Sequence, residues 1–168
     1  MIEYSNNENY TCIFDIESGL VRITYRGTIS PKVTHAVYTW MMDTLGKIED
    51  VSIIRGCIFD FRAVNVFDAA NLSTARRESL NFKRDQETFV ERIPALLIVE
   101  TTYQETMVRT SMKLAQQTEQ GDMPRVKMVK SVEEAHLYID AWHAFHGRNG
   151  NESNSTPIQS VDGSDSLE

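Results

Sequence analysis

The chain has 168 residues, enough for one domain with one sizeable hydrophobic core. Its 24 acidic against 17 basic residues give a net charge of -7, which argues against nucleic acid as a partner because phosphate backbones attract basic surfaces. Hydrophobic residues make up 41% of the chain, yet no apolar run approaches the ~20 residues that cross a bilayer, so we expect a soluble protein without a membrane span.

The amino terminus and the cysteines predict a cytoplasmic location. Met1–Asn9 is polar and acidic, unlike the basic and then apolar pattern of a secretory signal. Cys12 and Cys57 lie in apolar β-like runs without CxxC spacing. We therefore expect reduced core thiols rather than a disulfide, and we expect no metal and no cofactor.

A β-hairpin is predicted near the start of the chain. Two β-like runs, Tyr10–Asp15 and Leu20–Arg26, are separated by a short segment that ends in Gly19, which can adopt a turn conformation. Apolar and polar residues alternate in the second run, as in a strand with one solvated face. We expect this pair to lie toward an edge of a sheet.

The next segment has the pattern of a helix followed by a buried strand. Ser30 and Pro31 are typical of a helix start, with a capping hydroxyl and a proline in the first turn. The apolar residues that follow at helical spacing are Val33, Val37, Trp40, Met41, Leu45 and Ile48. The run 53–61 is apolar on both faces and predicts a central strand.

Two further helices and a strand are predicted in the middle of the chain. The helix over 71–83 has a weaker apolar pattern, and the run 94–100 reads as another buried strand. Thr102 and Glu105 have the spacing of a capping box, which predicts that a helix begins there and runs to about Gln117.

The last elements are a short strand and a capped helix. The run 125–129 alternates as a strand, and Ser131 with Glu134 forms a second capping-box pattern. From Gly147 the composition becomes rich in Gly, Asn, Ser and Asp. We predict one domain over 1–146 and a disordered acidic tail over 147–168.

The predicted order is β-β-α-β-α-β-α-β-α, which specifies an α/β fold. Strands that are separated by helices favour parallel neighbours, whereas the opening hairpin is antiparallel. We expect a mixed sheet of about five strands with about four helices.

This order, together with the stretch 58–72 (IFDFRAVNVFDAANL), resembles the STAS domain of anti-sigma factor antagonists and the broader SpoIIAA-like group of bacterial proteins. Asp60, Asp68 and Leu72 match family positions around the second helix, and the segment 125–142 resembles the family's last strand and helix. The similarity covers about 10–142 and implies a SpoIIAA-like mixed sheet.

The resemblance also implies a binding module that phosphorylation controls at the start of the second helix. The two serine positions hold Ala69 and Ala70 here, and the glycine position holds Asn71, so the chain lacks the phosphorylatable serine of the family. The nearest hydroxyls, Ser73 and Thr74, are the alternative phosphorylation sites.

An anion or partner site is the first functional hypothesis. A helix start that faces Arg62 and Arg76 would offer free N–H groups and positive charge. The full predicted set is Arg62, Asn65, Asp68, Asn71, Ser73 and Arg76. The alternative is that Asp68 or Asn71 only caps the helix while the arginines are solvated.

Three other clusters have structural alternatives. The basic residues Arg76, Arg77, Lys83 and Arg84 suggest an acidic partner surface or a solvated helix face. His136, Asp140 and His143 share a helix face that could hold a metal, although surface histidines explain it better. A ligand cavity or a plain core is suggested by Trp40, Met41, Met42, Met107 and Met112.

These observations favour a non-enzymatic regulatory or protein-interaction module that binds a protein partner or a second copy of itself as a homodimer. The alternative is a carrier or sensor of a small apolar or anionic ligand. No motif of an enzyme is present, and Asp60, Asp68 and Arg62 are the cluster that a catalytic hypothesis would test.

Overall fold

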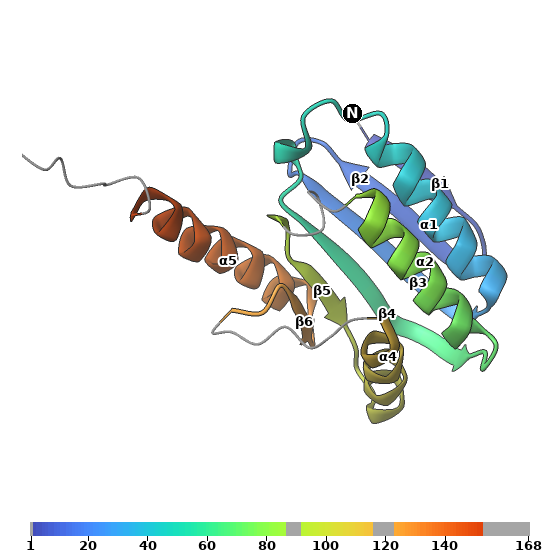
Figure 1. Cartoon of the computed structure of the whole chain (residues 1–168). Helices are drawn as coiled ribbons and strands as arrows, with labels where there is room; N and C mark the ends of the chain where they lie inside the picture. The colour runs from blue at the N-terminus through green and yellow to red at the C-terminus, as the bar shows by residue number, and fades with distance from the viewer. Residues whose placement is uncertain (1, 87–91, 116–122, 153–168) are drawn as a thin grey trace, which may run out of the picture.

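The computed structural model describes residues 2–86, 92–115 and 123–152 and shows one mixed sheet with helices on both faces (Figure 1). Its strands lie side by side in chain order: β1 (Ile2–Asn6), β2 (Tyr10–Asp15), β3 (Leu20–Ile29), β4 (Gly56–Phe67), β5 (Ala95–Ile98) and β6 (Val126–Val129). The helices are α1 (Pro31–Leu45), α2 (Asn71–Asp85), α4 (Thr102–Ala115) and α5 (Val132–Glu152), with a short 3₁₀ turn η1 (Val51–Ile53).

The predicted mixed α/β fold is confirmed. Strands β1 to β3 pair antiparallel, and β3 to β6 pair parallel through helical crossovers. The expected count of about five strands is one too low, because β1 forms an additional edge strand that pairs with β2. The strand has the short sequence IEYSN in a mainly polar segment, so it carries only a weak strand signal. Backbone hydrogen bonds to β2 hold it, and the Asn6 amide oxygen accepts bonds from Thr11 and Arg26.

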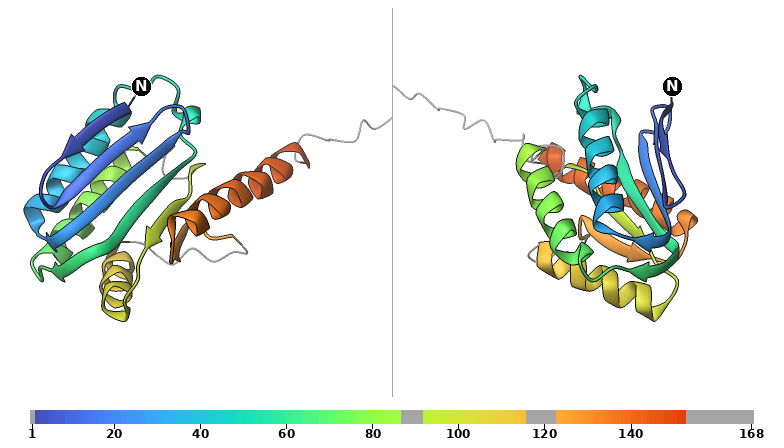
Figure 2. Two further views of the ribbon diagram at one scale, coloured as in Figure 1. Left: turned by 180° about the vertical axis from the view of Figure 1, so that it is seen from behind. Right: turned by 90° about the vertical axis from the view of Figure 1, so that its right-hand side faces the viewer.

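The two faces of the sheet carry different helices (Figure 2). Helices α1, α2 and α4 cover one face, which we call the three-helix face, and α5 covers the other, which we call the α5 face. Strand β4 alternates between them, with Phe59 and Phe61 on the three-helix face and Ile58 on the α5 face. The apolar stripe of α1 is buried as predicted, with Val33, Val37, Met41 and Leu45 in the core.

Side-chain caps begin the helices at or near the predicted positions. The Ser30 hydroxyl accepts a bond from Val33 N at 3.4 Å, as predicted for α1. Ser131 caps α5 by accepting from Glu134 N at 3.1 Å. The predicted box at Thr102 is wrong by one residue: Thr101 accepts from Gln104 N, and Gln104 Oε1 accepts in return from Thr101 N.

Gly19 fixes the turn between β2 and β3. Its φ of +68° lies in the left-handed region, and a Cβ there would lie 2.2 Å from the carbonyl oxygen of Ile53. The Gly19 carbonyl also accepts a bond from Arg55 N at 2.7 Å. A residue without a side chain is therefore required where this turn meets the segment that leads into β4.

Helix α5 continues beyond the predicted domain boundary. It ends at Glu152, so residues 147–152 are helical rather than part of the predicted tail. The helix has 21 residues, which gives a length of about 31 Å at about 1.5 Å per residue. The rest of the predicted tail, 153–168, lies outside the described residues. Over the part of the chain that is described, no helix has the length and apolar character to span a bilayer.

Candidate functional site: a cavity on the three-helix face

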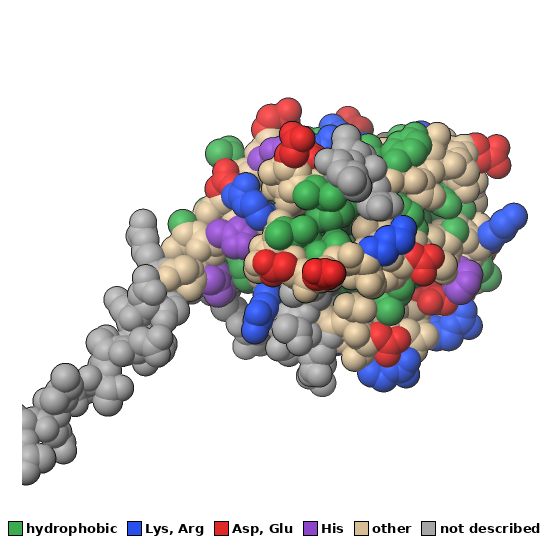
Figure 3. All heavy atoms as spheres, turned by 90° about the horizontal axis from the view of Figure 1, so that it is seen from above, with side chains coloured by type: hydrophobic (Ala, Val, Ile, Leu, Met, Phe, Trp, Pro, Cys, Tyr) green, Lys and Arg blue, Asp and Glu red, His purple; other side chains and the backbone are tan. Residues whose placement is uncertain are grey.

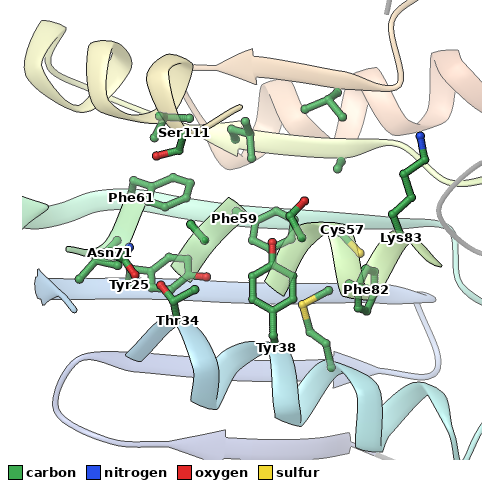
Figure 4. A pocket seen from close by; sticks show the side chains of 18 of the residues that line it. Tyr25, Thr34, Tyr38, Cys57, Phe59, Phe61, Asn71, Phe82, Lys83 and Ser111 are labelled. Carbon is green, nitrogen blue, oxygen red and sulfur yellow. The ribbon is translucent and has the colours of Figure 1, made fainter. Parts of the chain in front are cut away.

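A cavity of about 200 Å³ lies between the sheet and helices α1, α2 and α4. Strands β3, β4 and β5 form its floor, and the three helices form its walls (Figure 4). Its aromatic lining consists of Tyr25, Tyr38, Phe59, Phe61, Phe67 and Phe82. The parts of the wall that are not aromatic are mainly small or aliphatic side chains, so the space is suited to an apolar guest.

Aromatic contacts hold the walls of the cavity in place. Tyr25 on β3 stacks on Phe61 on β4 with ring centroids 5.0 Å apart and planes 11° apart. Phe61 also lies 6.1 Å from Phe67, while Tyr38 on α1 meets Phe82 on α2 edge-on at 5.9 Å. Such pairs contribute roughly 0.5–1.5 kcal/mol beyond their burial, so the walls are preorganised rather than loose.

Asn71, the first residue of α2, places a polar group against this apolar space (Figure 4). The residue is 7% exposed, and within the described part of the chain its Oδ1 has no hydrogen-bond partner. Asp68 positions it, because the Asp68 carbonyl accepts from Asn71 N at 2.8 Å and the Asp68 carboxylate accepts from Ala70 N at 2.9 Å. A buried, unpaired acceptor is unfavourable by about 1–3 kcal/mol, which makes Asn71 the distinctive feature of the cavity.

The titratable groups in the apolar interior of the cavity are neutral at physiological pH. Burial raises the pKa of the Cys57 thiol to about 12, against a partial opposing effect of Arg125. Burial raises the pKa of Tyr25 well above its ordinary value, with smaller contributions from Tyr38 and Cys12. Burial also raises the pKa of Tyr38, which a hydrogen bond to Ser79 partly offsets. The described lining residues include no carboxylate and no histidine, so they offer no general base.

Positive charge marks the other end of the cavity. Lys83 and Arg125 both line it, and Lys83 is exposed. Lys83 follows Asn71 by twelve residues on α2, which corresponds to about 18 Å along the helix axis. Seen from the end at which β4 and β5 begin, hydrophobic side chains are visible at the centre between charged side chains of both signs (Figure 3). The cavity therefore has an apolar centre, one buried acceptor and a basic end.

The structure does not bring Arg62 to the start of α2. The Arg62 guanidinium bonds to Asp60, with Nη2 2.7 Å from Oδ2 and Nε 3.0 Å from Oδ1. Asp60 alternates with Phe59 and Phe61 along β4 and therefore lies on the α5 face, where Arg62 bonds to it, whereas α2 lies on the three-helix face. Burial would raise the pKa of Asp60, but hydrogen bonds from the Arg62 side chain and backbone outweigh it and lower the pKa. The predicted anion pocket between Arg62 and Arg76 is not formed.

The other predicted site residues gather around the first turns of α2 in different environments. Asp68 makes the turn described above, and the exposed Ser73 donates its hydroxyl to the Ala70 carbonyl at 3.1 Å. Asn65 is exposed on β4, and Arg76 is exposed on α2. Thr74 is 8% exposed, so its hydroxyl is poorly placed for a kinase. Of the predicted set, only Asn71 lines the cavity.

The outer side of α2 carries an open hollow away from the cavity. It is lined by Ala69, Leu72, Ser73, Arg76, Arg77 and Leu80. Leu80 is 48% exposed, which is unusual for a leucine in a helix of otherwise polar character. This surface joins two predicted site residues, Ser73 and Arg76, on one side of the helix.

The remaining predicted clusters have mostly structural roles. In the basic cluster, Arg77 bonds to Glu78 and Arg84 bonds to Asp85 on the helix surface. Asp140 bonds to the Arg55 guanidinium at 2.6 Å, and His143 Nε2 lies 2.6 Å from the Arg55 carbonyl. Among the residues with assigned positions, no three metal-binding side chains come together.

The prediction of a methionine-lined cavity is wrong about most of the residues that line it. Of the four predicted residues whose side chains are described, only Met41 lines the cavity; the Met112 side chain lies outside the described residues. Trp40 and Met42 instead pack against the core of the three-helix face. Aromatic rings from β3 and β4 replace the predicted methionines. The alternation of Phe59 and Phe61 along 53–61 was the signal that could have identified them, because it places both rings on one face.

Gln104 is a structural residue whose contacts with β4 the sequence did not reveal. It is 3% exposed, and its Nε2 donates to the carbonyls of Arg62 and Val64, each at 3.1 Å. Its Oε1 accepts from Glu100 N at 2.9 Å and from Thr101 N at 3.2 Å. One side chain thus fixes the start of α4 to β4, beside the rings that line the cavity.

No family model and no curated protein matches the sequence. Among solved structures, the unphosphorylated anti-sigma factor antagonist SpoIIAA is 11% identical, covers 82% of this chain and 94% of its own, and has a TM-score of 0.45. An uncharacterized DUF3478-family protein with a SpoIIAA-like fold, from Shewanella loihica, is 11% identical over 83% of this chain and 92% of its own, with a TM-score of 0.47.

A third match is to a membrane protein. The murine anion transporter Slc26a9 in its inward-facing state is 15% identical over 74% of this chain but only 18% of its own length, with a TM-score of 0.47. SpoIIAA and the SpoIIAA-like fold named for the first two matches are the same group that the sequence resembles. Identities this low concern the fold alone.

Proposed function

We propose that the protein is a non-enzymatic binding module that holds a small, mainly apolar ligand in the cavity on the three-helix face. The observation that carries this proposal is the aromatic-lined space of about 200 Å³ with a buried, unpaired acceptor at Asn71. Spaces of this size are few in natural cores, because the missing contacts are unfavourable, so the cavity suggests an occupant.

The chemistry of the walls supports binding rather than catalysis. Tyr25, Tyr38 and Cys57 keep their protons at neutral pH, so the interior offers neither a nucleophile nor a base. An apolar guest would gain about 25 cal/mol for each Å² of apolar surface removed from water. A charged guest would bind unfavourably, because it would lose its hydration and find no buried counterion.

Thermal unfolding in the presence of small apolar and aromatic probes tests the proposal. A ligand that binds only the folded protein raises the melting temperature in a concentration-dependent way. Ala75→Leu fills the cavity from α2 and should abolish the shift, whereas Leu80→Gln on the outer side of α2 is the matched control and should keep it. The proposal fails if no probe shifts the melting temperature, or if Ala75→Leu leaves the shifts unchanged.

A second candidate function is a regulatory protein-interaction module that uses the outer hollow of α2. The observation in its favour is the exposed Leu80 beside Arg76 and Arg77, which suits an acidic partner with an apolar centre. Phosphorylation of Ser73 would place a phosphate three and four residues before these arginines on the same helix side. A homodimer remains a prediction of the same kind.

Partner capture with matched variants tests this second candidate. The chain is recovered from its own cytosol with phosphatase inhibitors, alongside Leu80→Asp and Leu137→Asp. Both leucines are exposed, and Leu137 lies on α5, so only the first substitution should remove a partner that binds the α2 hollow. A partner that survives Leu80→Asp would exclude this surface.

A further inference from the structure

We propose that the ligand is a flat aromatic molecule of one or two fused rings with a single N–H or O–H group that donates to Asn71 Oδ1. This inference rests on the proposed function of the cavity and names the chemical class of its guest. Three features of the described residues carry it: the unpaired acceptor, the shape of the ring-lined space and the absence of charge in its interior.

The unpaired acceptor selects a hydrogen-bond donor. Asn71 lines the cavity at 7% exposure, and its Oδ1 has no partner among the described residues. The second such atom in the described ranges is Trp142 Nε1, which belongs to a ring stacked on His146 of α5. A ligand donor would satisfy Asn71, whereas a ligand without one would seal the acceptor away from water.

The shape and size of the space favour a planar ring. Tyr25 and Phe61 lie almost parallel, 11° apart, on the side of the space that contains Asn71 (Figure 4), and Phe67 lies 6.1 Å from Phe61. Aromatic guests gain from offset-stacked and edge-on contacts with such walls. A cavity of roughly 150 Å³ holds one benzene ring, so the space of about 200 Å³ suits one ring or two fused rings.

The interior charge favours a neutral donor. The phenols of Tyr25 and Tyr38 and the thiol of Cys57 stay protonated, so no buried anion compensates an ammonium group. The cationic groups that line the cavity, Lys83 and Arg125, lie toward the opposite end from Asn71. An indole N–H or a phenol O–H meets the requirement at Asn71 without introducing a buried charge.

A pair of isomers tests the inference. 3-Methylindole and 1-methylindole have the same molecular formula, but only 3-methylindole has an N–H group. Titration calorimetry with the full chain should give an affinity about tenfold or more higher for 3-methylindole, since an unsatisfied buried acceptor costs about that factor or more. Asn71→Leu replaces the acceptor with an apolar side chain of similar size, and it should bring the two affinities together.

A second variant keeps the inference testable if Asn71→Leu does not fold. Asn71→Asp keeps an acceptor at the same position and removes the amide donor, so it should retain the preference for 3-methylindole. Quinoline, which only accepts hydrogen bonds, should bind the unmodified chain more weakly than indole does.

The outcomes separate the ligand class from the proposed function. Equal binding of the two isomers to the unmodified chain would overturn the ligand class while leaving a binding cavity. A preference for quinoline, or an isomer preference that survives Asn71→Leu, would also overturn it. If no aromatic or aliphatic probe binds, the proposed function fails and this inference fails with it.

Discussion

The two faces of the sheet solve the same packing problem differently. On the α5 face, Ile58 of β4 packs into a closed cluster with Ile139 of α5, and the charge of Asp60 is neutralised by Arg62. On the three-helix face, Phe59 and Phe61 of the same strand line an open space. The difference teaches that one strand can build a dense core on one side and a binding cavity on the other, because its side chains alternate.

Side-chain size explains how close each layer approaches the sheet. Gly56 lets α5 lie close to β4, since a Cβ there would be 2.9 Å from the end of the Ile139 side chain. On the opposite face, the stacked rings of Tyr25 and Phe61 occupy the layer between sheet and helices. The cavity of about 200 Å³ lies beside these rings.

The largest expected effect is on the dense face. Ile139→Ala removes a side chain that is 1% exposed and should lower the free energy of unfolding by about 2–5 kcal/mol, because the packed cluster cannot collapse into the gap. Urea denaturation followed by circular dichroism measures it. Leu137→Ala on the same helix is the control, since this residue is 71% exposed and its loss should change stability by about 0.5 kcal/mol or less. Equal effects would contradict the contrast.

An intermediate effect is expected at the junction of α4 and β4. Gln104→Met keeps the size of the side chain but removes four hydrogen bonds to backbone groups. We expect a loss of about 1–3 kcal/mol, together with faster amide exchange at Glu100 and Thr101. Hydrogen exchange measured by NMR separates this local loosening from a general destabilisation, which would affect α5 equally.

A small effect on stability is expected when the cavity is filled. Ala75→Leu adds apolar volume where the structure has space, so the free energy of unfolding should change by about 1 kcal/mol or less while ligand binding is lost. Chemical denaturation of the ligand-free protein measures the first quantity. A cost comparable to that of Ile139→Ala would show that the space is not available to a side chain.

The smallest effects separate the two faces by pH. Cys57 has a pKa raised by burial from 9.0 to about 12, so its contribution to stability is complete below pH 9 and is lost as the pH rises toward 12. Asp60 has a pKa below 3.8, so its contribution is present above that pH and is lost as the pH falls through the lowered value. The urea midpoint of the unmodified chain should fall at both ends of this pH range. The fall at high pH should be smaller in Cys57→Ala, and the fall at low pH should be smaller in Asp60→Asn. The reverse assignment would contradict the account.

The sequence predicted the fold well because its signals are local. The Ser30 cap and the buried stripe of α1 each follow from residues close together in the chain, and the structure confirms both. Strand β1 was missed because its alternation of Ile2 and Tyr4 with Glu3 and Ser5 is only four residues long and stands in a segment of mainly polar composition, while backbone pairing with β2 holds it. The capping box shifted from Thr102 to Thr101 because two overlapping patterns compete in the sequence, and only the structure distinguishes them.

The site was less predictable because it depends on contacts between distant segments. The sequence places Asn71 in a surface anion site. In the structure its side chain is buried and lines the cavity, because α2 begins over the aromatic side of the sheet. Arg62 was placed in the same site, yet the alternation of β4 sends it to the opposite face to meet Asp60. Gln104 has capping-box spacing with Thr101, but its bonds to β4 gave no signal, since these partners lie about forty residues earlier in the chain.

The most direct test of the binding cavity is an NMR titration of the full chain with indole, followed through backbone amide shifts. The account predicts saturable shifts that are largest around Tyr25, Phe61 and Asn71 and that leave the half of α5 around Ile139 nearly unchanged. Shifts that do not saturate, or that centre on α5 instead of the three-helix face, would contradict it.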